Sequence, residues 1–114
     1  MSLLKKPAAR KKVTPEDLKI LERIRQLRLQ MLVHSCLYYK YDKPVITDKE
    51  FDERGRELAK LQKLYPTHSK KVRYYEAFKD FNGDTGYHLP YDEGRVMNKA
   101  IQIWNIDRKY KEKK

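Results

Sequence analysis

The sequence is poor in the features that mark several common protein classes. Its 114 residues contain a single cysteine, Cys36, so no internal disulfide can form, and a reducing cytoplasmic setting is expected. No apolar run approaches the roughly 20 residues that a membrane span needs, and the N-terminus has no apolar stretch of the signal-peptide type. With only four glycines and five prolines, disorder throughout the chain is not expected.

Basic residues are abundant, but they are concentrated at the two ends. The net charge is +11, of which residues 1–12 carry +5 and residues 108–114 carry +4. Subtracting both contributions leaves only +2 for residues 13–107. We therefore expect a basic flexible tail over 1–12, a single helical domain over 13–107 and a basic C-terminal tail over 108–114. The positive charge of these tails would either keep the protein soluble or attract nucleic acid weakly.

The apolar spacing predicts an all-α fold. Thr14-Pro15 is a helix start, and Asp17 has the spacing of a capping box with Thr14. Apolar residues then recur with a helical period that predicts a wide buried face: Leu18, Ile20, Leu21, Ile24, Leu27, Met31 and Leu32, with Arg23, Arg25 and Arg28 between them. This helix is predicted over about 15–40, because Pro44 disfavours helical geometry in the residue before it.

A second helix is predicted over about 47–65, antiparallel to the first. Thr47 and Glu50 repeat the capping-box spacing, and Pro66 marks the end of the helix. Gly55 lies inside this helix at a cost of ~1 kcal/mol relative to alanine, which suggests that another element approaches it closely.

The second half of the chain has a weaker pattern. Residues 67–73 read as a polar connection, residues 74–81 as a short helix or turn, and residues 82–86 as a loop. A last helix is predicted over about 91–107, with a buried stripe at Val96, Met97, Ala100, Ile103 and Trp104.

Motifs for metal binding and nucleophilic catalysis fail in detail. Asp80-Phe81-Asn82-Gly83-Asp84 resembles the start of a calcium loop, but Thr85 and Tyr91 stand where glycine and glutamate are required. The three histidines and Cys36 match no zinc spacing. We expect no metal, a buried structural thiol at Cys36 and no catalytic residue.

The stretch 34–52, HSCLYYKYDKPVITDKEFD, combines aromatic and acidic side chains around one proline. His34 and Tyr38 are four residues apart, as are Asp48 and Asp52, so each pair shares one helix face. A turn at Pro44 would fold these faces toward each other and form a pocket with aromatic walls and carboxylate edges. Such a pocket suits a cationic ring. The alternative is that the aromatic residues belong to the core and the aspartates only cap a helix.

The same stretch resembles the N-terminal helical subdomain, domain Ia, of bacterial NAD-dependent DNA ligases. That family has a His-x-x-x-Tyr run, then Asp-x-Pro-x-Ile-x-Asp-x-Glu-Tyr-Asp and an Arg-Glu-Leu helix. The matching residues are His34, Leu37, Tyr38, Tyr39, Asp42, Pro44, Ile46, Asp48, Glu50, Phe51, Asp52, Arg56, Glu57, Leu58, Leu61, Tyr65 and Pro66. The resemblance covers residues 17–66; Phe51 replaces a tyrosine, and Arg54-Gly55 replaces a usually apolar pair.

The resemblance implies a ligand and its contacts. In those ligases the subdomain recognises the nicotinamide mononucleotide (NMN) half of NAD and closes over the adenylation domain. The implied cofactor-binding residues are Tyr38, Tyr39, Asp48, Phe51 and Asp52. The Lys-x-Asp-Gly adenylation motif is absent, because Lys43 follows Lys40-Tyr41-Asp42 where glycine is needed. No ligase activity is therefore expected from these residues alone.

Three functions remain open. The first is a free-standing, non-catalytic domain-Ia-like protein of the kind expected from a phage or prophage. It would bind NMN or NAD and act with a DNA-metabolism partner. The second is a small basic nucleic-acid-associated module with no small-molecule ligand. The third is a structural or protein-interaction module. None of them involves a membrane.

Overall fold

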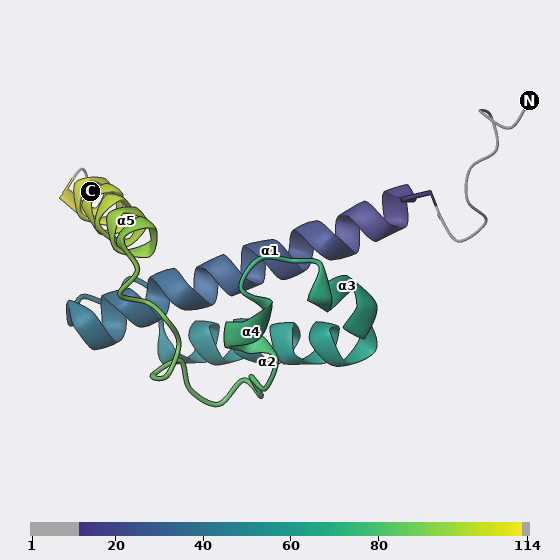
Figure 1. Cartoon of the computed structure of the whole chain (residues 1–114). Helices are drawn as coiled ribbons and strands as arrows, with labels where there is room; N and C mark the ends of the chain where they lie inside the picture. The colour runs from purple at the N-terminus through teal and green to yellow at the C-terminus, as the bar shows by residue number, and fades with distance from the viewer. Residues whose placement is uncertain (1–11, 113–114) are drawn as a thin grey trace, which may run out of the picture.

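The computed structural model describes residues 12–112, and all regular elements in that range are helical (Figure 1). This confirms the all-α prediction. In chain order the elements are α1 (Pro15–Ser35), η2 (Cys36–Lys40), α2 (Asp48–Leu64), α3 (Pro66–Lys70), α4 (Tyr75–Phe78) and α5 (Gly94–Glu112). The predicted N-terminal tail falls almost entirely outside the described residues.

The first helix begins and ends as predicted. Thr14 Oγ1 accepts from the Asp17 backbone N–H, and the Asp17 carboxylate accepts from the Thr14 N–H, which completes the capping box. Helical structure continues through η2 to Lys40. The chain then turns at Asp42, whose φ of 54° is in the left-handed region that aspartate tolerates better than most residues.

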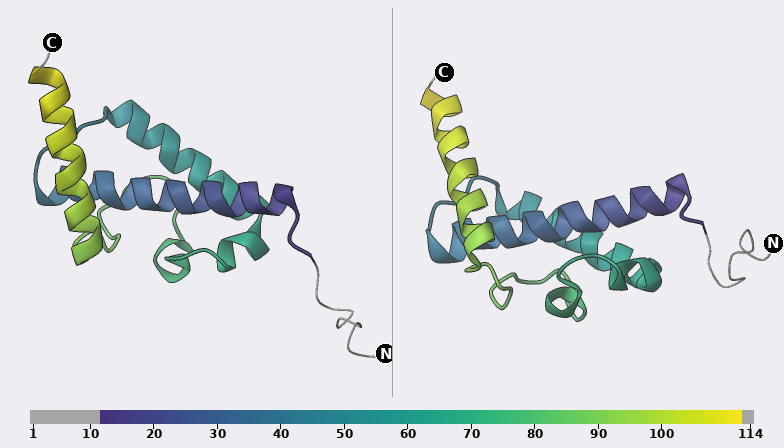
Figure 2. Two further views of the ribbon diagram at one scale, coloured as in Figure 1. Left: turned by 90° about the horizontal axis from the view of Figure 1, so that it is seen from above. Right: turned by 45° about the horizontal axis from the view of Figure 1, so that its top comes forward.

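Packing of α1 against α2 forms the body of the molecule (Figure 2). The core between them includes Ile24, Leu27, Met31, Leu32 and Leu58, all with no exposed surface. Leu18 was predicted on the buried face, which is wrong: it is 58% exposed, because the first turns of α1 project past the end of α2 (Figure 1).

The Arg28 side chain links the pair of helices α1 and α2 to the second half of the chain. Its side chain is fully buried, although the sequence pattern gave no sign of this. The guanidinium donates to Gln62 Oε1 at 2.8 Å, Ser69 Oγ at 2.6 Å and the Val72 and Arg73 carbonyls at 2.9 and 3.1 Å. These bonds compensate the buried charge and hold the chain after α3 against α1.

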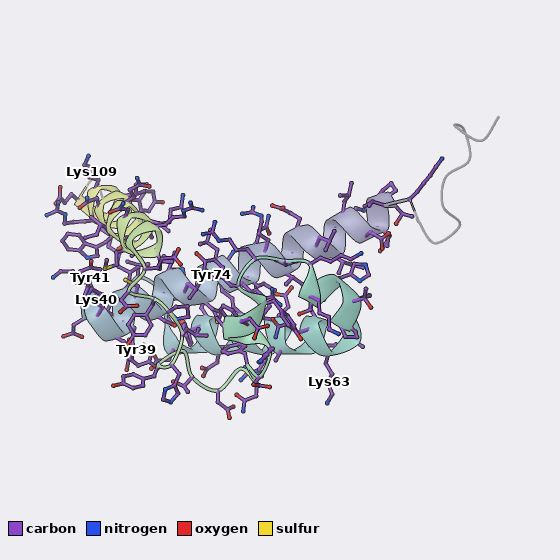
Figure 3. All side chains as sticks on the ribbon, in the orientation of Figure 1. Tyr39, Lys40, Tyr41, Lys63, Tyr74 and Lys109 are labelled. Atoms are coloured by element: carbon purple, nitrogen blue, oxygen red, sulfur yellow. The ribbon has the colours of Figure 1, made fainter. Side chains whose placement is uncertain are left out.

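The second half of the chain follows the expected order with two differences. Residues 67–73 were predicted as a connection, but Pro66–Lys70 form α3, because proline favours the first position of a helix as well as ending the one before it. α5 begins at Gly94 and continues to Glu112, beyond the predicted end at about 107. The basic residues of positions 108–112 therefore lie on a helix and point outward, as Lys109 does in Figure 3.

Gly55 and Gly83 allow the loop after α4 to reach α2. A Cβ on Gly55 would lie 3.1 Å from the Gly83 carbonyl oxygen, and a Cβ on Gly83 would lie 3.1 Å from the Gly55 carbonyl oxygen. Gly83 also has a φ of +91°. The close approach predicted at Gly55 is therefore confirmed, and its partner is the 82–86 loop.

We expect Gly83→Ala to lower the free energy of unfolding by about 1–3 kcal/mol, because it combines an unfavourable φ with a tight backbone contact. Urea denaturation followed by circular dichroism measures this. Gly94→Ala is the matched control, since no atom lies within 4 Å of a Cβ there and the helix should tolerate or favour alanine. Equal stability of the two variants would contradict the inferred role of the contact.

Candidate functional site

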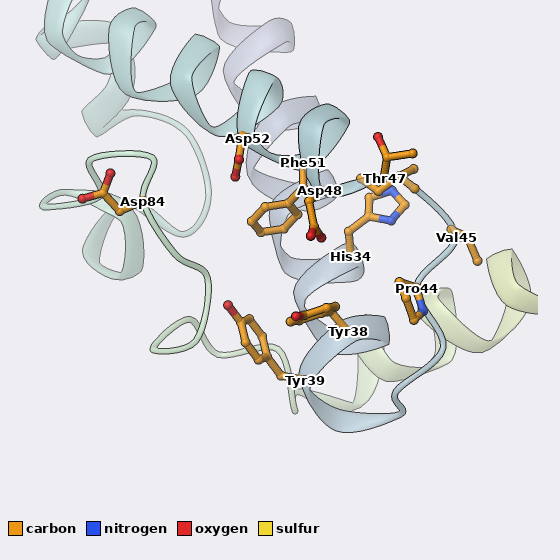
Figure 4. Close-up of a pocket in the computed structure, with 11 residues that line it drawn as sticks. His34, Tyr38, Tyr39, Pro44, Val45, Thr47, Asp48, Phe51, Asp52 and Asp84 are labelled. Atoms are coloured by element: carbon orange, nitrogen blue, oxygen red, sulfur yellow. The ribbon is translucent and has the colours of Figure 1, made fainter.

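A cavity of about 210 Å³ lies at the corner between η2 and α2 (Figure 4). Its walls come from the end of the first helix, the corner, the start of the second helix and the loop after α4. The lining residues are His34, Tyr38, Tyr39, Pro44, Val45, Ile46, Thr47, Asp48, Phe51, Asp52 and Asp84. All five residues that were predicted to bind a cofactor are among them.

The aromatic wall includes Tyr38 and Tyr39, which lie on η2, a short π-helix with wider turns than an α-helix. The Tyr41 N–H donates to the Cys36 carbonyl, five residues back, at 3.2 Å. This π-type bond shifts the side chains out of the α-helical register, a distortion that is frequent at functional sites. The Tyr38 and Tyr39 rings meet edge to face with centroids 4.9 Å apart, and the Tyr38 side chain is 48% exposed. Tyr38 therefore presents a ring at the rim of the cavity.

The acidic wall is formed by the first turns of α2. Asp48 is the first residue of α2, and Asp52 follows one turn later. The helix is capped by Thr47 and Glu50, so neither aspartate makes the capping bonds. Within residues 12–112, no hydrogen bond or ion pair engages either carboxylate. Both are thus free to accept hydrogen bonds from a ligand in the cavity.

His34 lies at the base of the cavity and is only 8% exposed. Burial, assisted by the nearby Arg54 guanidinium and opposed by Glu50, lowers the pKa of His34 to about 4. Arg54 Nη1 is 3.4 Å from His34 Nε2. Because arginine can only donate, Nε2 must accept, and the ring proton then resides on Nδ1. His34 Nδ1 is buried and has no partner within the described structure.

Asp84 is a lining residue with a carboxylate that sequence reasoning missed. The sequence of its loop resembles only an incomplete calcium motif, and no group of three or more potential metal-ligating side chains is found within residues 12–112. The signal that pointed to this loop was Gly55, whose place inside a helix implied a close neighbour.

Cys36 is buried, as predicted for a structural thiol. Burial raises the pKa of its thiol, which disfavours the reactive thiolate.

Among the described helices, none is long and apolar enough to cross a bilayer.

Comparison with known proteins gives a match over residues 17–76. The matching family model is described as "DNA ligase-like, N-terminal NAD+-binding domain". A DNA ligase of Syntrophotalea carbinolica is 50% identical over 46 residues, which are 40% of this chain and 7% of that protein. A DNA ligase of Leptospira biflexa is 50% identical over 56 residues, covering 49% of this chain and 8% of that protein.

A more distant relative is a DNA ligase of Thermotoga petrophila, 38% identical over 47 residues that make up 41% of this chain and 7% of that protein. The chain thus spans less than a tenth of the length of these relatives. No solved structure matches the chain significantly. The matched range contains every lining residue of the cavity except Asp84.

The neutral state of His34 predicts a loss of stability in mild acid. Because the pKa of His34 is about 4 when folded and near 6.5 when unfolded, the unfolded chain binds more protons between these values. The free energy of unfolding should therefore fall by up to about 3 kcal/mol as pH drops from 6.5 to 4. Urea denaturation at several pH values measures it.

His34→Leu should remove most of this pH dependence, whereas the matched variant of an exposed histidine, His88→Gln, should retain it. A wild-type stability that stays constant between pH 6.5 and 4 would disprove the buried neutral state.

Proposed function

Because the chain belongs to the family of DNA ligase-like, N-terminal NAD+-binding domains, we propose that its cavity binds the NMN half of NAD+. The observation that carries this proposal is the joint lining of one hollow by the aromatic residues Tyr38, Tyr39 and Phe51 and the carboxylates of Asp48 and Asp52. Four of these five residues are the types that the ligase resemblance implies, and the fifth, Phe51, keeps the aromatic face of the family's tyrosine.

The chemistry of the lining suits this ligand. The nicotinamide ring of NAD+ is flat and positively charged, so it gains from aromatic faces by about 0.5–2 kcal/mol for each cation–π contact. The ribose hydroxyls donate hydrogen bonds, and Asp48 and Asp52 have carboxylates available to accept them. The ligand phosphate then belongs at the open side of the cavity, away from these negative charges.

The size of the cavity favours half of the dinucleotide over the whole. At about 210 Å³ it is smaller than the roughly 300–1,000 Å³ of pockets that enclose drug-sized ligands. It accommodates the nicotinamide ring and part of the ribose, and the adenylate half then extends beyond these walls.

We further propose that the chain recognises the cofactor and does not itself catalyse a reaction. The family match is to an N-terminal domain, and the chain covers less than a tenth of the ligases it resembles. Adenylyl transfer would then require a nucleotidyltransferase domain outside these 114 residues. The exposed ring of Tyr38, at the rim of the cavity, is available to such a domain.

The cofactor proposal is tested by titrating the protein with NMN and following backbone amide shifts by NMR. We expect saturable shifts at residues of the cavity, and Asp52→Ala should weaken binding at least about tenfold, because a hydrogen bond to a charged group contributes about 1.5–3 kcal/mol.

The control for this titration is Glu53→Ala, which changes the neighbouring exposed carboxylate outside the cavity and should leave the affinity unaltered. Both variants should retain the helical circular dichroism of the wild type. The proposal is refuted by a wild-type protein that shows no shifts at millimolar NMN.

The partner proposal predicts complementation. An NAD-dependent ligase that lacks its own N-terminal helical domain should regain self-adenylation with NAD+ when this chain is added, and Asp52→Ala should not restore it. Transfer of radiolabelled adenylate to the truncated ligase measures the effect. Restoration by the Asp52→Ala variant would show that the cavity plays no part.

A further inference from the structure

A groove lined by basic side chains lies between α1 and α5, away from the cavity described above. Figure 2 shows α5 crossing α1, and two hollows of about 250 and 350 Å³ lie where these helices meet, with Leu29 and Arg95 lining both. We call the two together the basic groove. Its cationic lining residues are Arg25, Arg73, Arg95 and Lys99. None of its lining residues belongs to the cavity at the corner between η2 and α2.

Tertiary structure gathers these four cations from three separate segments. They come from α1, from the turn before α4 and from the first turns of α5. Residues 13–107 are nearly balanced in charge, so the sequence gives no sign of a basic face there. In the described part of the chain no carboxylate lines the groove, whose uncharged lining residues are Leu29, Tyr74, Asn98 and Gln102. The carboxylates of the folded part therefore lie elsewhere, including those at the cavity.

The walls of the basic groove are held in place by contacts that need no ligand. Arg28 donates to the Arg73 carbonyl at 3.1 Å and so holds this turn against α1. Tyr74 has a φ of 72°, which is unfavourable for a bulky residue, and its hydroxyl donates to Glu93 Oε1 at 2.6 Å, just before α5. The Arg73 guanidinium lies over the Tyr74 ring, 5.0 Å from its centroid. The cations are thus presented on a pre-organised surface.

Two of the four cations have no counter-charge. Arg95 and Lys99 are one helical turn apart on α5, and both are exposed. Over residues 12–112, no hydrogen bond or ion pair engages either side chain. Their charges are available to an anion that enters the groove.

The other two cations keep part of their donor capacity. Arg25 is paired with Glu22 through Nε at 3.0 Å and Nη2 at 2.6 Å, so the pair does not use Nη1. Arg73 Nη2 is 3.9 Å from Glu93 Oε1, which is too long for a hydrogen bond. Both guanidinium groups can therefore donate to a further acceptor.

The chemistry of this lining favours a repeating phosphate over an acidic protein. A guanidinium donates in a fork that matches the oxygens of a phosphate, and cations on separate elements suit an anion with several charges. The centre of a protein interface is apolar, whereas Leu29 is the one aliphatic side chain among the lining residues. Interfaces with nucleic acid are polar and strongly positive.

We propose that the basic groove is a docking surface for the sugar–phosphate backbone of nucleic acid. This goes beyond the proposed function, because it concerns a different surface and a different ligand. It also differs from the expectation that nucleic acid is attracted by the two basic ends of the chain, since the groove belongs to the folded part.

The test is the salt dependence of binding to a fluorescently labelled duplex DNA of about 20 base pairs, followed by anisotropy with the full chain between roughly 50 and 200 mM salt. Each phosphate contact contributes about −0.9 to the slope of log K against log salt. The double variant Arg95→Gln/Lys99→Gln should therefore reduce the slope by about 2 and weaken binding at the lowest salt at least about tenfold. Both residues are exposed, so the helical circular dichroism should be unchanged.

The double variant Lys60→Gln/Lys63→Gln is the matched control. It removes the same charge from two exposed positions of α2 that do not line the groove. We expect it to change the affinity less than threefold. Equal losses in the two double variants would overturn the inference, because overall charge would then be the cause.

Two competitors complete the test. Excess NMN should leave DNA binding unaltered, because the cavity and the groove share no lining residue. Polyglutamate at equal charge concentration should compete at least about tenfold less well than unlabelled DNA, and equal competition would indicate an acidic protein as the partner and overturn the inference. A wild type that does not bind DNA at the lowest salt, or whose binding NMN abolishes, would also overturn it. NMN binding measured by itself remains the separate test of the proposed function.

Discussion

The antiparallel packing of the first long helix against α2 brings together two kinds of side chain that the sequence keeps apart. Aromatic rings lie on η2, at the end of the first long helix, and carboxylates lie in the first turns of α2. The corner at Asp42 and Pro44 reverses the chain, so the rings and the carboxylates face each other. The core of Leu27, Met31 and Leu58 provides the free energy that holds this arrangement. The cavity is therefore a consequence of how the hairpin buries its apolar faces.

Two further contacts outside the cavity position its walls. Arg28 donates a hydrogen bond to Ser69 and so holds α3 against α1. The Gly55–Gly83 contact lets the backbone of the loop after α4 approach the backbone of α2 closely. Because each contact depends on the other half of the chain, the segment after α4 is part of the cavity wall. The match to the ligase family ends before this segment, so the family relationship accounts for three sides of the cavity and not for the fourth.

The division of charge in the molecule is consistent with a recognition role. The cavity is lined by carboxylates without a lysine or arginine, while the excess of basic residues lies at the two ends of the chain. A ligand that carries a cationic ring and an anionic phosphate would be oriented by these carboxylates, with the ring inward and the phosphate outward. Such an orientation suits a domain that presents a cofactor to a catalytic partner.

The sequence by itself determined the helices and the family. Both capping boxes, the long helices and the buried cysteine could be read from local spacing, because caps and helix faces depend on residues three or four positions apart. The five predicted lining residues were implied by the resemblance to the ligase family. Tertiary structure alone decided the burial of Arg28, the exposure of Leu18 and the place of Asp84. These three depend on contacts between residues far apart in the chain, and local periodicity carries no information about such contacts.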